Sequence, residues 1–291
     1  MSLPSGYKRL EYIQSTGTQY VDAGFKPTGS TKVVCDFQML NQGSSQQGVF
    51  GSRPGTSGRF TVFTGYGTTD LQVDYNTEQT LASVGSSITG LNVNSRTTLE
   101  VSNSLVINGT TVKTVSATSF TSTYNLFLFA NNNAGKAQLP GILKLYSCQI
   151  YDNGTLVRDF IPCKNTGGAV GLWDDVNSVF YGNAGTGTFT AGPVVVVIPD
   201  APSNLQQTMS VRLIWAEVSG AEQYNVYRDN TLLGTTTGLF YVDDTAEENT
   251  EYTYAVSAVN SAGESQKTTI SVYTKTGYFL YKPYVESATF Q

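Results

Sequence analysis

The chain has 291 residues, of which 13% are charged, with a net charge of −5 and no histidine. A nucleic-acid-binding role is excluded by the lack of a basic face, since no Lys/Arg cluster exceeds Lys8-Arg9. Without histidine, the usual general base of serine and cysteine hydrolases and the commonest metal ligand are missing. Abundant Gly, Ser, Thr and Asn, with many Tyr and Phe, predict an all-β protein of short strands and polar turns.

The first two thirds of the chain alternate between apolar and polar residues with the period of two that is typical of half-buried strands. Such runs predict strands at residues 32–39, 59–63 and 71–75, and a shorter one at Tyr20-Val21. The run 124–130 is almost wholly apolar. We therefore expect it to form one strand that is buried on both faces.

Two hairpins are indicated by Asn-Gly pairs at residues 108–109 and 153–154. Asn-Gly readily adopts the positive φ angles of a type I′ turn, whose twist matches that of the flanking strands. The sequence therefore predicts antiparallel hairpins at residues 104–113 and 145–160.

A domain boundary is expected near residue 193. No helical pattern interrupts roughly twelve predicted strands before that point, which is typical of a two-sheet sandwich of the jelly-roll kind. We assign residues 1–193 to this domain and the aliphatic run 194–198 to a linker, which is far too short to span a membrane. Residues 199–275 follow with the strand spacing of an immunoglobulin-like sandwich.

Five strands of the second domain are predicted at residues 213–215, 223–228, 231–234, 240–243 and 251–259. Trp215 is expected in the core, and Tyr252 in a tyrosine corner with its hydroxyl bonded back to the preceding turn. Residues 276–291 form an aromatic tail, whose apolar surface would favour association with other molecules if it were left free. Four tail residues are expected to dock on a neighbouring subunit: Tyr278, Phe279, Tyr281 and Tyr284.

The three cysteines, Cys35, Cys148 and Cys163, fit no metal-binding spacing. We interpret them as buried free thiols. The sequence leaves open a disulfide between Cys148 and Cys163, which are expected on neighbouring strands.

Paired carboxylates, which a glycosidase needs, are not recognisable in the first domain. Its three glutamates, Glu11, Glu78 and Glu100, are isolated from one another in sequence. Asp70 and Asp74 share a strand face but would lie about 13 Å apart. We therefore expect no catalytic residues and no enzymatic activity.

A set of residues in the second domain matches a known module in order and spacing: Pro199, Pro202, Leu205, Trp215, Tyr224-x-Val226-Tyr227-Arg228, Thr250-Glu251-Tyr252-x-Tyr254-x-Val256 and Val259-Asn260-Ser261-Ala262-Gly263-Glu264-Ser265. With this set, residues 199–274 resemble a fibronectin type III module. The resemblance implies a spacer or interaction domain and names no specific function.

Two stretches near the ends of the first domain carry a second resemblance. One runs from Gly6 to Asp22, and the other comprises Gly171-Leu172-Trp173-Asp174-Asp175-Val176 and the segment from Phe180 to Phe189. Both resemble a concanavalin A-like/laminin-G jelly roll, in a variety common in phages and in surface proteins of gut Gram-positive bacteria. Since the first and last strands of such a roll lie side by side, the resemblance implies that the two stretches share one core.

This resemblance implies a structural protein of a bacteriophage virion, on a tail, a baseplate or a capsid fibre. Such a protein would assemble with other virion proteins and as a homo-oligomer, and would contact the host surface. No signal peptide follows Met1, so we expect synthesis in the bacterial cytoplasm. The alternative is a carbohydrate-binding surface adhesin of a Gram-positive bacterium, whose partner would be a cell-surface glycan. Neither function requires nucleic acid or membrane insertion.

Sugar sites in this fold use aromatic platforms and polar loops, so the resemblance also implies candidate ligand-binding residues: Tyr66, Tyr75, Trp173 and Asn131-Asn132-Asn133. Core packing is the competing interpretation for Trp173, and a plain turn is the competing interpretation for the three asparagines. No cofactor or metal is expected. A calcium site at Asp22, Asp174 and Asp175 is left open, although no spacing motif supports it.

Overall fold

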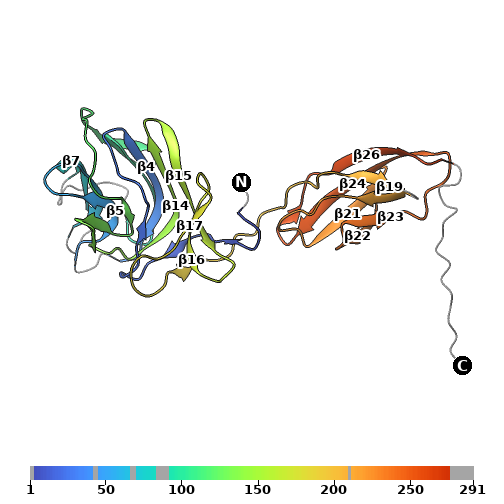
Figure 1. Ribbon diagram of the computed structural model, residues 1–291, viewed down its shortest axis with the longest axis horizontal. Coiled ribbons are helices and arrows are strands. Elements are labelled where there is room, and N and C mark those ends of the chain that lie inside the picture. The colour runs from blue at the N-terminus through green and yellow to red at the C-terminus, as the bar shows by residue number, and fades with distance from the viewer. Residues whose placement is uncertain (1–2, 42–44, 66–69, 83–91, 209–210, 276–291) are drawn as a thin grey trace, which may run out of the picture. The chain divides into compact units, whose positions relative to one another are not determined.

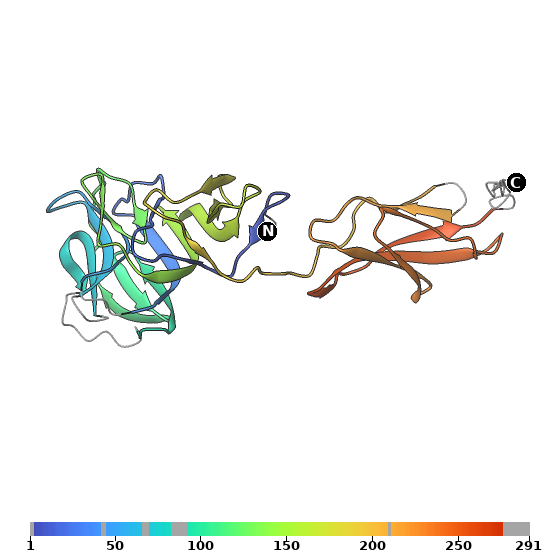
Figure 2. The same ribbon diagram turned by 90° about the horizontal axis from the view of Figure 1, so that it is seen from below.

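The computed structural model of the chain is all-β. The residues that it describes are 3–41, 45–65, 70–82, 92–208 and 211–275. The chain divides into two units, Met1–Val195 and Val196–Gln291, within the linker expected at residues 194–198. Figures 1 and 2 show that each unit is built from layered strands. No α-helix occurs among the described residues, so none of them forms a helix that could cross a membrane.

The larger sheet of the first unit has eleven strands among the described residues. Eight of them follow one another in the order β10 (Thr110–Thr114), β9 (Ser104–Ile107), β8 (Arg96–Val101), β4 (Thr31–Met39), β14 (Leu143–Asp152), β15 (Thr155–Lys164), β16 (Val170–Asp174) and β17 (Val179–Tyr181). The other three are β1 (Lys8–Arg9), which pairs with β15, and β2 (Ile13–Gln14), which pairs with β14 and with β18 (Thr190–Ala191).

The smaller sheet has seven strands within the described part of the chain. They are β3 (Val21–Asp22), β5 (Gly48–Arg53), β6 (Arg59–Thr64), β7 (Leu71–Ala82), β11 (Phe127–Leu128), β12 (Asn131–Asn133) and β13 (Lys136–Gln138). Strand β5 is central, because it pairs with β6, with β11 and with β12. The pairing of β5 with β12 is parallel, whereas the other two are antiparallel.

One hydrophobic core lies between these two sheets. In β4 the odd-numbered side chains are buried and the even-numbered ones are half-buried, as expected for a strand with one face on the core. The larger sheet contributes Phe37 and Ile150 to the core, and the smaller sheet contributes Phe50, Val62 and Val73. Burial of each such side chain stabilises the fold by about 1.5–3 kcal/mol, so the two sheets hold each other in place.

The two stretches that carry the resemblance of the first domain meet in this core. Leu10 and Ile13 of the first stretch and Leu172 and Phe189 of the second are all buried there. The backbone joins them as well, since the N–H of Ala184 donates a hydrogen bond of 2.8 Å to the carbonyl of Tyr20. The two stretches therefore share one core, as expected.

Both predicted hairpins are present. Asn108 and Asn153 have φ angles of 48°, and the glycines that follow have φ angles of 78°, as a type I′ turn requires. The prediction of one continuous strand at residues 124–130 is wrong. Only Phe127–Leu128 forms a strand, because the chain turns at Phe129, whose φ angle is 67°.

All three cysteines are buried and free. Cys148 lies directly opposite Cys35, where β14 pairs with β4, and a hydrogen bond between the two thiols, together with burial, raises the pKa of Cys35. On β15 the residue opposite Cys148 is Phe160, so Cys163 is displaced by three residues, or about 10 Å. A disulfide requires Cα atoms within about 7 Å. The strand register therefore rules out the Cys148–Cys163 disulfide that the sequence left open.

The second unit contains two further sheets. One consists of β19 (Gln206–Thr208), β20 (Arg212–Ile214) and β23 (Phe240–Val242), in that order. The other consists of β22 (Thr231–Thr236), β21 (Gln223–Arg228), β24 (Glu251–Asn260), β25 (Gly263–Glu264) and β26 (Thr268–Tyr273), with β24 paired to β21 on one side and to β25 and β26 on the other.

The two expectations for aromatic residues of this unit are confirmed. Trp215 is buried, and its ring centroid lies 5.4 Å from that of Tyr224 in the core. The Tyr252 hydroxyl accepts a hydrogen bond of 3.0 Å from the backbone N–H of Glu247. This bond ties β24 to the turn that precedes it, as a tyrosine corner does.

A buried carboxylate joins the two sheets of the second unit. Asp243, directly after β23, accepts hydrogen bonds of 2.8 Å from Arg228 of β21 and 2.7 Å from the Tyr254 hydroxyl of β24. Thr245 donates to the same carboxylate through its backbone N–H and its hydroxyl. Burial opposes ionisation of Asp243, but these hydrogen bonds and the Arg228 charge outweigh it and lower the pKa of the carboxyl group.

Substitution of Asp243 by Asn is expected to destabilise the second unit by about 3 kcal/mol at neutral pH, because Arg228 loses its buried partner. Because the pKa of Asp243 is lower in the folded state, its ionisation stabilises the fold above the unfolded-state pKa of about 3.9. This stabilisation is lost as the pH falls through the folded-state pKa. The difference between wild type and D243N, measured by denaturant unfolding, should therefore shrink below about pH 4.

The exposed Asp200 provides the control for this comparison, and D200N should match wild type throughout the pH range. A difference between D243N and wild type that stays constant down to the lowest pH would contradict the assigned role of the charge.

Candidate functional site

Two groups of residues predicted to be functional lie outside the described residues. These are Tyr66 and the four tail residues Tyr278, Phe279, Tyr281 and Tyr284. Their roles in ligand binding and in assembly stay predictions.

Tyr75 does not offer its ring to a ligand, so its prediction as a binding residue is wrong. The side chain is 1% exposed and belongs to the core between the two sheets. Its hydroxyl donates a hydrogen bond of 2.6 Å to the carbonyl of Gly29. The reason is positional, because Leu71, Val73 and Tyr75 occupy the alternate positions of β7 that face the core.

Trp173 is packed against other aromatic rings and is only 9% exposed. Its ring lies edge-on to that of Tyr7, with a centroid distance of 5.4 Å. Phe180 is its opposite residue on β17 and also contacts Tyr7. The competing interpretation of Trp173, packing, therefore describes its environment, and the predicted aromatic platform is not present at this residue.

The three asparagines at 131–133 form strand β12, so both sequence interpretations, an exposed binding loop and a plain turn, are wrong. Asn132 donates to the carbonyl of Asn125 and accepts from the backbone N–H of Gly135. Asn133 donates a hydrogen bond of 2.7 Å to Gln138. These two side chains therefore hold the β12–β13 hairpin and are committed to the fold.

Asn131 differs from its two neighbours. Its side chain is 1% exposed, and neither its Oδ1 nor its Nδ2 has a hydrogen-bond partner within the protein. It lies over Gly51, its neighbour on β5, where a Cβ atom would collide with the Asn131 amide. Gly51 is thus required because it leaves the space that the Asn131 side chain fills.

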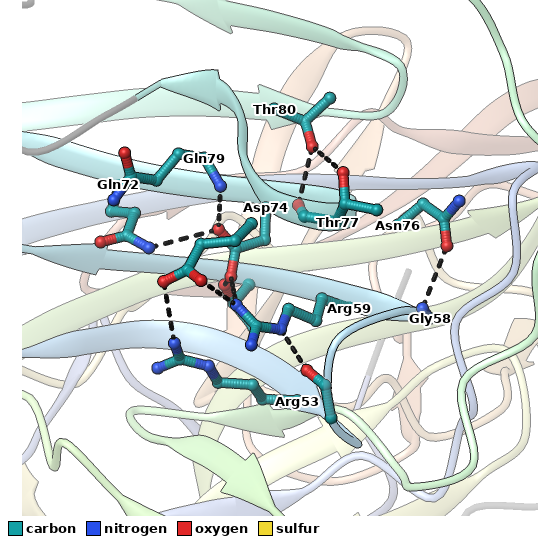
Figure 3. A network of polar contacts seen from close by, with 12 residues as sticks. Arg53, Gly58, Arg59, Gln72, Asp74, Asn76, Thr77, Gln79 and Thr80 are labelled. Atoms are coloured by element: carbon teal, nitrogen blue, oxygen red, sulfur yellow. Dashed lines mark hydrogen bonds and ion pairs between the residues drawn. The ribbon is translucent and has the colours of Figure 1, made fainter.

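Figure 3 shows a network of polar contacts around Asp74, which the sequence did not predict. Asp74 is fully buried on the face of β7 that points away from the core. Its carboxylate accepts hydrogen bonds of 2.9 Å from the Thr61 hydroxyl and 2.7 Å from the backbone N–H of Gln79. Asn76 and Gln79 have φ angles of 66° and 52°, so the chain bends between them and brings Gln79 back to Asp74.

Two arginines neutralise the acidic groups of this network. Arg59 Nη1 lies 3.2 Å from a Glu78 oxygen and 3.7 Å from an Asp74 oxygen, while Arg53 Nη2 lies 3.4 Å from Glu78. Arg59 also donates through Nε to the carbonyl of Gly55. Asp74 and Glu78 thus share one guanidinium group. Asp74 has no exposed surface and its oxygens already accept hydrogen bonds, so the arrangement stabilises the bend.

The alternation of residues in the sequence predicts only part of this network. The alternation at residues 71–75 indicates a strand whose even-numbered residues leave the core, which places Asp74 on the outer face. The positive φ angles at Asn76 and Gln79 carry no such periodic signal. In a straight strand, Glu78 would lie about 13 Å from Asp74.

A second buried carboxylate occupies the end of β16. Asp174 is fully buried and accepts hydrogen bonds from the backbone N–H groups of Asp159 and Val176 and from the Asn177 amide. Arg158 Nε lies 3.5 Å from Oδ2 of Asp174, the oxygen that also accepts the Asn177 bond. Asp174 is therefore committed to the turn between β16 and β17.

These bonds bear on the calcium site that the sequence left open. Asp22 likewise accepts hydrogen bonds from the Gly24 N–H and the Asn125 amide. Within the described part of the chain, no three side chains of His, Cys, Asp or Glu gather closely enough to hold a metal ion. Both bonds to Asp22 end on the same oxygen, Oδ1, and the calcium site stays an open prediction.

Comparison with known proteins gives short local similarities, and no protein-family model matches the chain. The chain is 38% identical over 101 residues to a poly(3-hydroxybutyrate) depolymerase of Ralstonia pickettii, a match that covers 33% of this chain and 19% of that protein. It is also 38% identical over 78 residues to a tail tube protein of Bacillus phage SPP1, which covers 25% of this chain and 30% of that protein. The chain therefore spans less than a third of the length of either relative.

Two solved structures are similar over different shares of the chain. The crystal structure of FN3tt is 33% identical, with coverage of 28% of this chain and 99% of that chain and a TM-score of 0.25. The tripod from the baseplate of bacteriophage Tuc2009 is 14% identical, with coverage of 87% and 72% and a TM-score of 0.18. TM-scores this low establish no common fold.

Substitution of Gly51 by Ala is expected to destabilise the first unit by about 2 kcal/mol, since the added Cβ atom overpacks against Asn131. In an Asn131→Ala background, the same substitution should cost less than about 1 kcal/mol because the collision is removed. Denaturant unfolding of the four proteins of this double-mutant cycle measures the difference.

Gly167 is the matched control, because its added Cβ atom would meet only Asn165, at 3.5 Å. G167A should leave stability nearly unchanged. An equal cost of G51A in both backgrounds would show that the Asn131 side chain does not impose glycine at position 51.

Proposed function

We propose that this chain is a structural component of a bacteriophage virion, in its tail, baseplate or capsid fibre, that assembles with other virion proteins and with copies of itself. The observation that carries the proposal is the 38% identity over 78 residues to a phage tail tube protein. Within the described residues, the buried carboxylates of both β-units hold turns or bends, which agrees with a structural role. We further propose that the units have the concanavalin A-like and fibronectin type III folds that the sequence resemblances imply.

The similarity to a depolymerase favours a shared module over a shared activity. The match covers 19% of that protein, so most of the enzyme lies outside the matched region. The chain has no histidine, and the neighbouring carboxylates of Asp74 and Glu78 share the Arg59 guanidinium group as a counter-charge. We therefore propose that the chain is not an enzyme.

The alternative function, a carbohydrate-binding adhesin, has less support. It relied on aromatic platforms and a polar loop, whereas Tyr75 and Trp173 are packed and the three asparagines form a strand. Contact with the host surface remains part of the proposal for the virion protein, and Tyr66 is the candidate that would carry it.

Mass spectrometry of phage particles purified on a density gradient tests the proposed function. Peptides of this chain should co-purify with known tail or capsid proteins at a constant ratio across the gradient, because a structural subunit is present in fixed copy number. A host cytoplasmic protein of similar abundance serves as the control for carry-over. Particles that contain their other structural proteins and lack this chain would contradict the proposal.

A second experiment tests the absence of catalysis. The purified chain should not clear a poly(3-hydroxybutyrate) film under conditions in which an authentic depolymerase does, because the chain has no histidine to act as the general base of a serine hydrolase. Clearing that survives repurification would overturn the non-enzymatic assignment and leave the particle experiment unaffected.

A further inference from the structure

Strand β23 lies at the edge of its sheet, since the order is β19, β20, β23 and no described strand pairs with its outer side (Figure 1). The N–H of Asp243 bonds to the carbonyl of Val211, and the N–H of Trp215 bonds to the carbonyl of Leu239. In an antiparallel pair, hydrogen-bonded positions alternate with positions whose backbone groups point the other way.

The backbone direction along β23 follows from these two bonds. Tyr241, midway between Leu239 and Asp243, directs its N–H and C=O toward β20. Phe240 and Val242 therefore direct theirs toward the open edge. The strand thus presents the hydrogen-bonding groups that an added strand requires.

The side chains along this edge are apolar on both faces of the sheet. Phe240 and Val242 project outward and are 48% and 46% exposed, while Leu239 is 40% exposed at the start of the strand. Tyr241 points inward and is only partly covered by the core. Residues 239–242 contain no lysine and no proline, which are the residues that commonly protect an edge strand from pairing.

The aromatic tail, residues 276–291, complements the β23 edge in its apolar side chains and in its charge. Residues 278–281 are Tyr-Phe-Leu-Tyr, so a strand formed by them would be apolar on both faces, as the edge demands. Lys275 and Lys282 flank this run. The edge ends at two exposed acidic residues, Asp244 and Glu247, which complement the flanking lysines in charge.

We propose that the β23 edge of one copy binds residues 278–281 of another copy as an added antiparallel strand. The register that pairs Val242 with Tyr278 and Phe240 with Leu280 places Lys275 opposite Thr245, next to Asp244. This inference rests on the proposed function, because it names the contact through which copies of a structural subunit would join.

The sheet order requires that the tail come from another copy. The tail follows β26, which lies next to β19, and an added strand beyond β23 lies three strand spacings, or about 14 Å, from β19. From Lys275 to Tyr278 the chain spans at most about 11 Å when fully extended. Tyr278 therefore does not reach Val242 of its own copy in the proposed register.

Disulfide trapping between two variants tests this pairing. Val242→Cys is placed in one chain and Tyr278→Cys in a second chain, and the mixture is oxidised gently with oxidised glutathione. Opposite residues of a hydrogen-bonded antiparallel pair lie about 5.5 Å apart at Cα, within the range of a disulfide. The native cysteines are buried and do not compete.

The expected result is a disulfide-linked dimer of V242C with Y278C, at least about tenfold more abundant than with a control cysteine. The control is Val112→Cys, because Val112 is similarly exposed, at 42%, on the edge strand β10 of the first unit. Two outcomes overturn the proposal: trapping no stronger than with V112C, or a V242C/Y278C double variant that cross-links only within its own chain.

A peptide of residues 275–284, labelled with a fluorophore, gives an independent measurement on the purified full chain. Fluorescence anisotropy should report binding to the wild type and at least about tenfold weaker binding to Val242→Pro, which removes the outward N–H while sparing the bonds to β20. Circular dichroism verifies that this variant is folded, and Val242→Lys replaces it if it is not. Equal affinity for wild type and variant refutes the proposal, whatever the particle experiment finds.

Discussion

Successive side chains of a β-strand point to opposite faces of its sheet, and this alternation determines which residues of the protein are buried together. In the first unit, two sheets bury one face of each strand in a shared core, and this places every second residue on the opposite face. Leu71, Val73 and Tyr75 of β7 enter the core, so Gln72 and Asp74 leave it. The polar network of Figure 3 is the consequence, because a carboxylate buried on the outer face must be hydrogen-bonded and paired.

Three buried carboxylates, one at a bend and two at strand ends, are stabilised in the same way. Asp74, Asp174 and Asp243 each accept a backbone N–H and lie beside an arginine. Each fixes a place where the chain leaves or bends out of a strand. Loss of one partner of such a buried pair destabilises strongly, whereas the intact pair adds modest net stability. These groups therefore define where the chain turns or bends.

Interaction surfaces in such a protein are expected at the sheet edges, where backbone groups and apolar side chains remain available. Strand β10 of the first unit and strand β23 of the second both end their sheets, but they differ in character. Four of the five residues of β10 are Thr or Lys, whereas β23 is wholly apolar. An edge of the second kind is a stronger template for pairing, since hydrogen bonds and apolar contacts act together.

Features that depend on neighbouring residues could be predicted from the sequence. The hairpins at Asn108-Gly109 and Asn153-Gly154, the boundary within residues 194–198 and the tyrosine corner at Tyr252 all follow from neighbouring residues. The burial of individual polar residues depends on contacts between distant segments and could not be predicted in this way. Asp74 meets Glu78 because positive φ angles bend β7, Asn131 lies over Gly51 because β12 runs parallel to β5, and Cys148 faces Cys35 through the register of β14. Register and bends join residues far apart in the sequence, and no local periodicity encodes them.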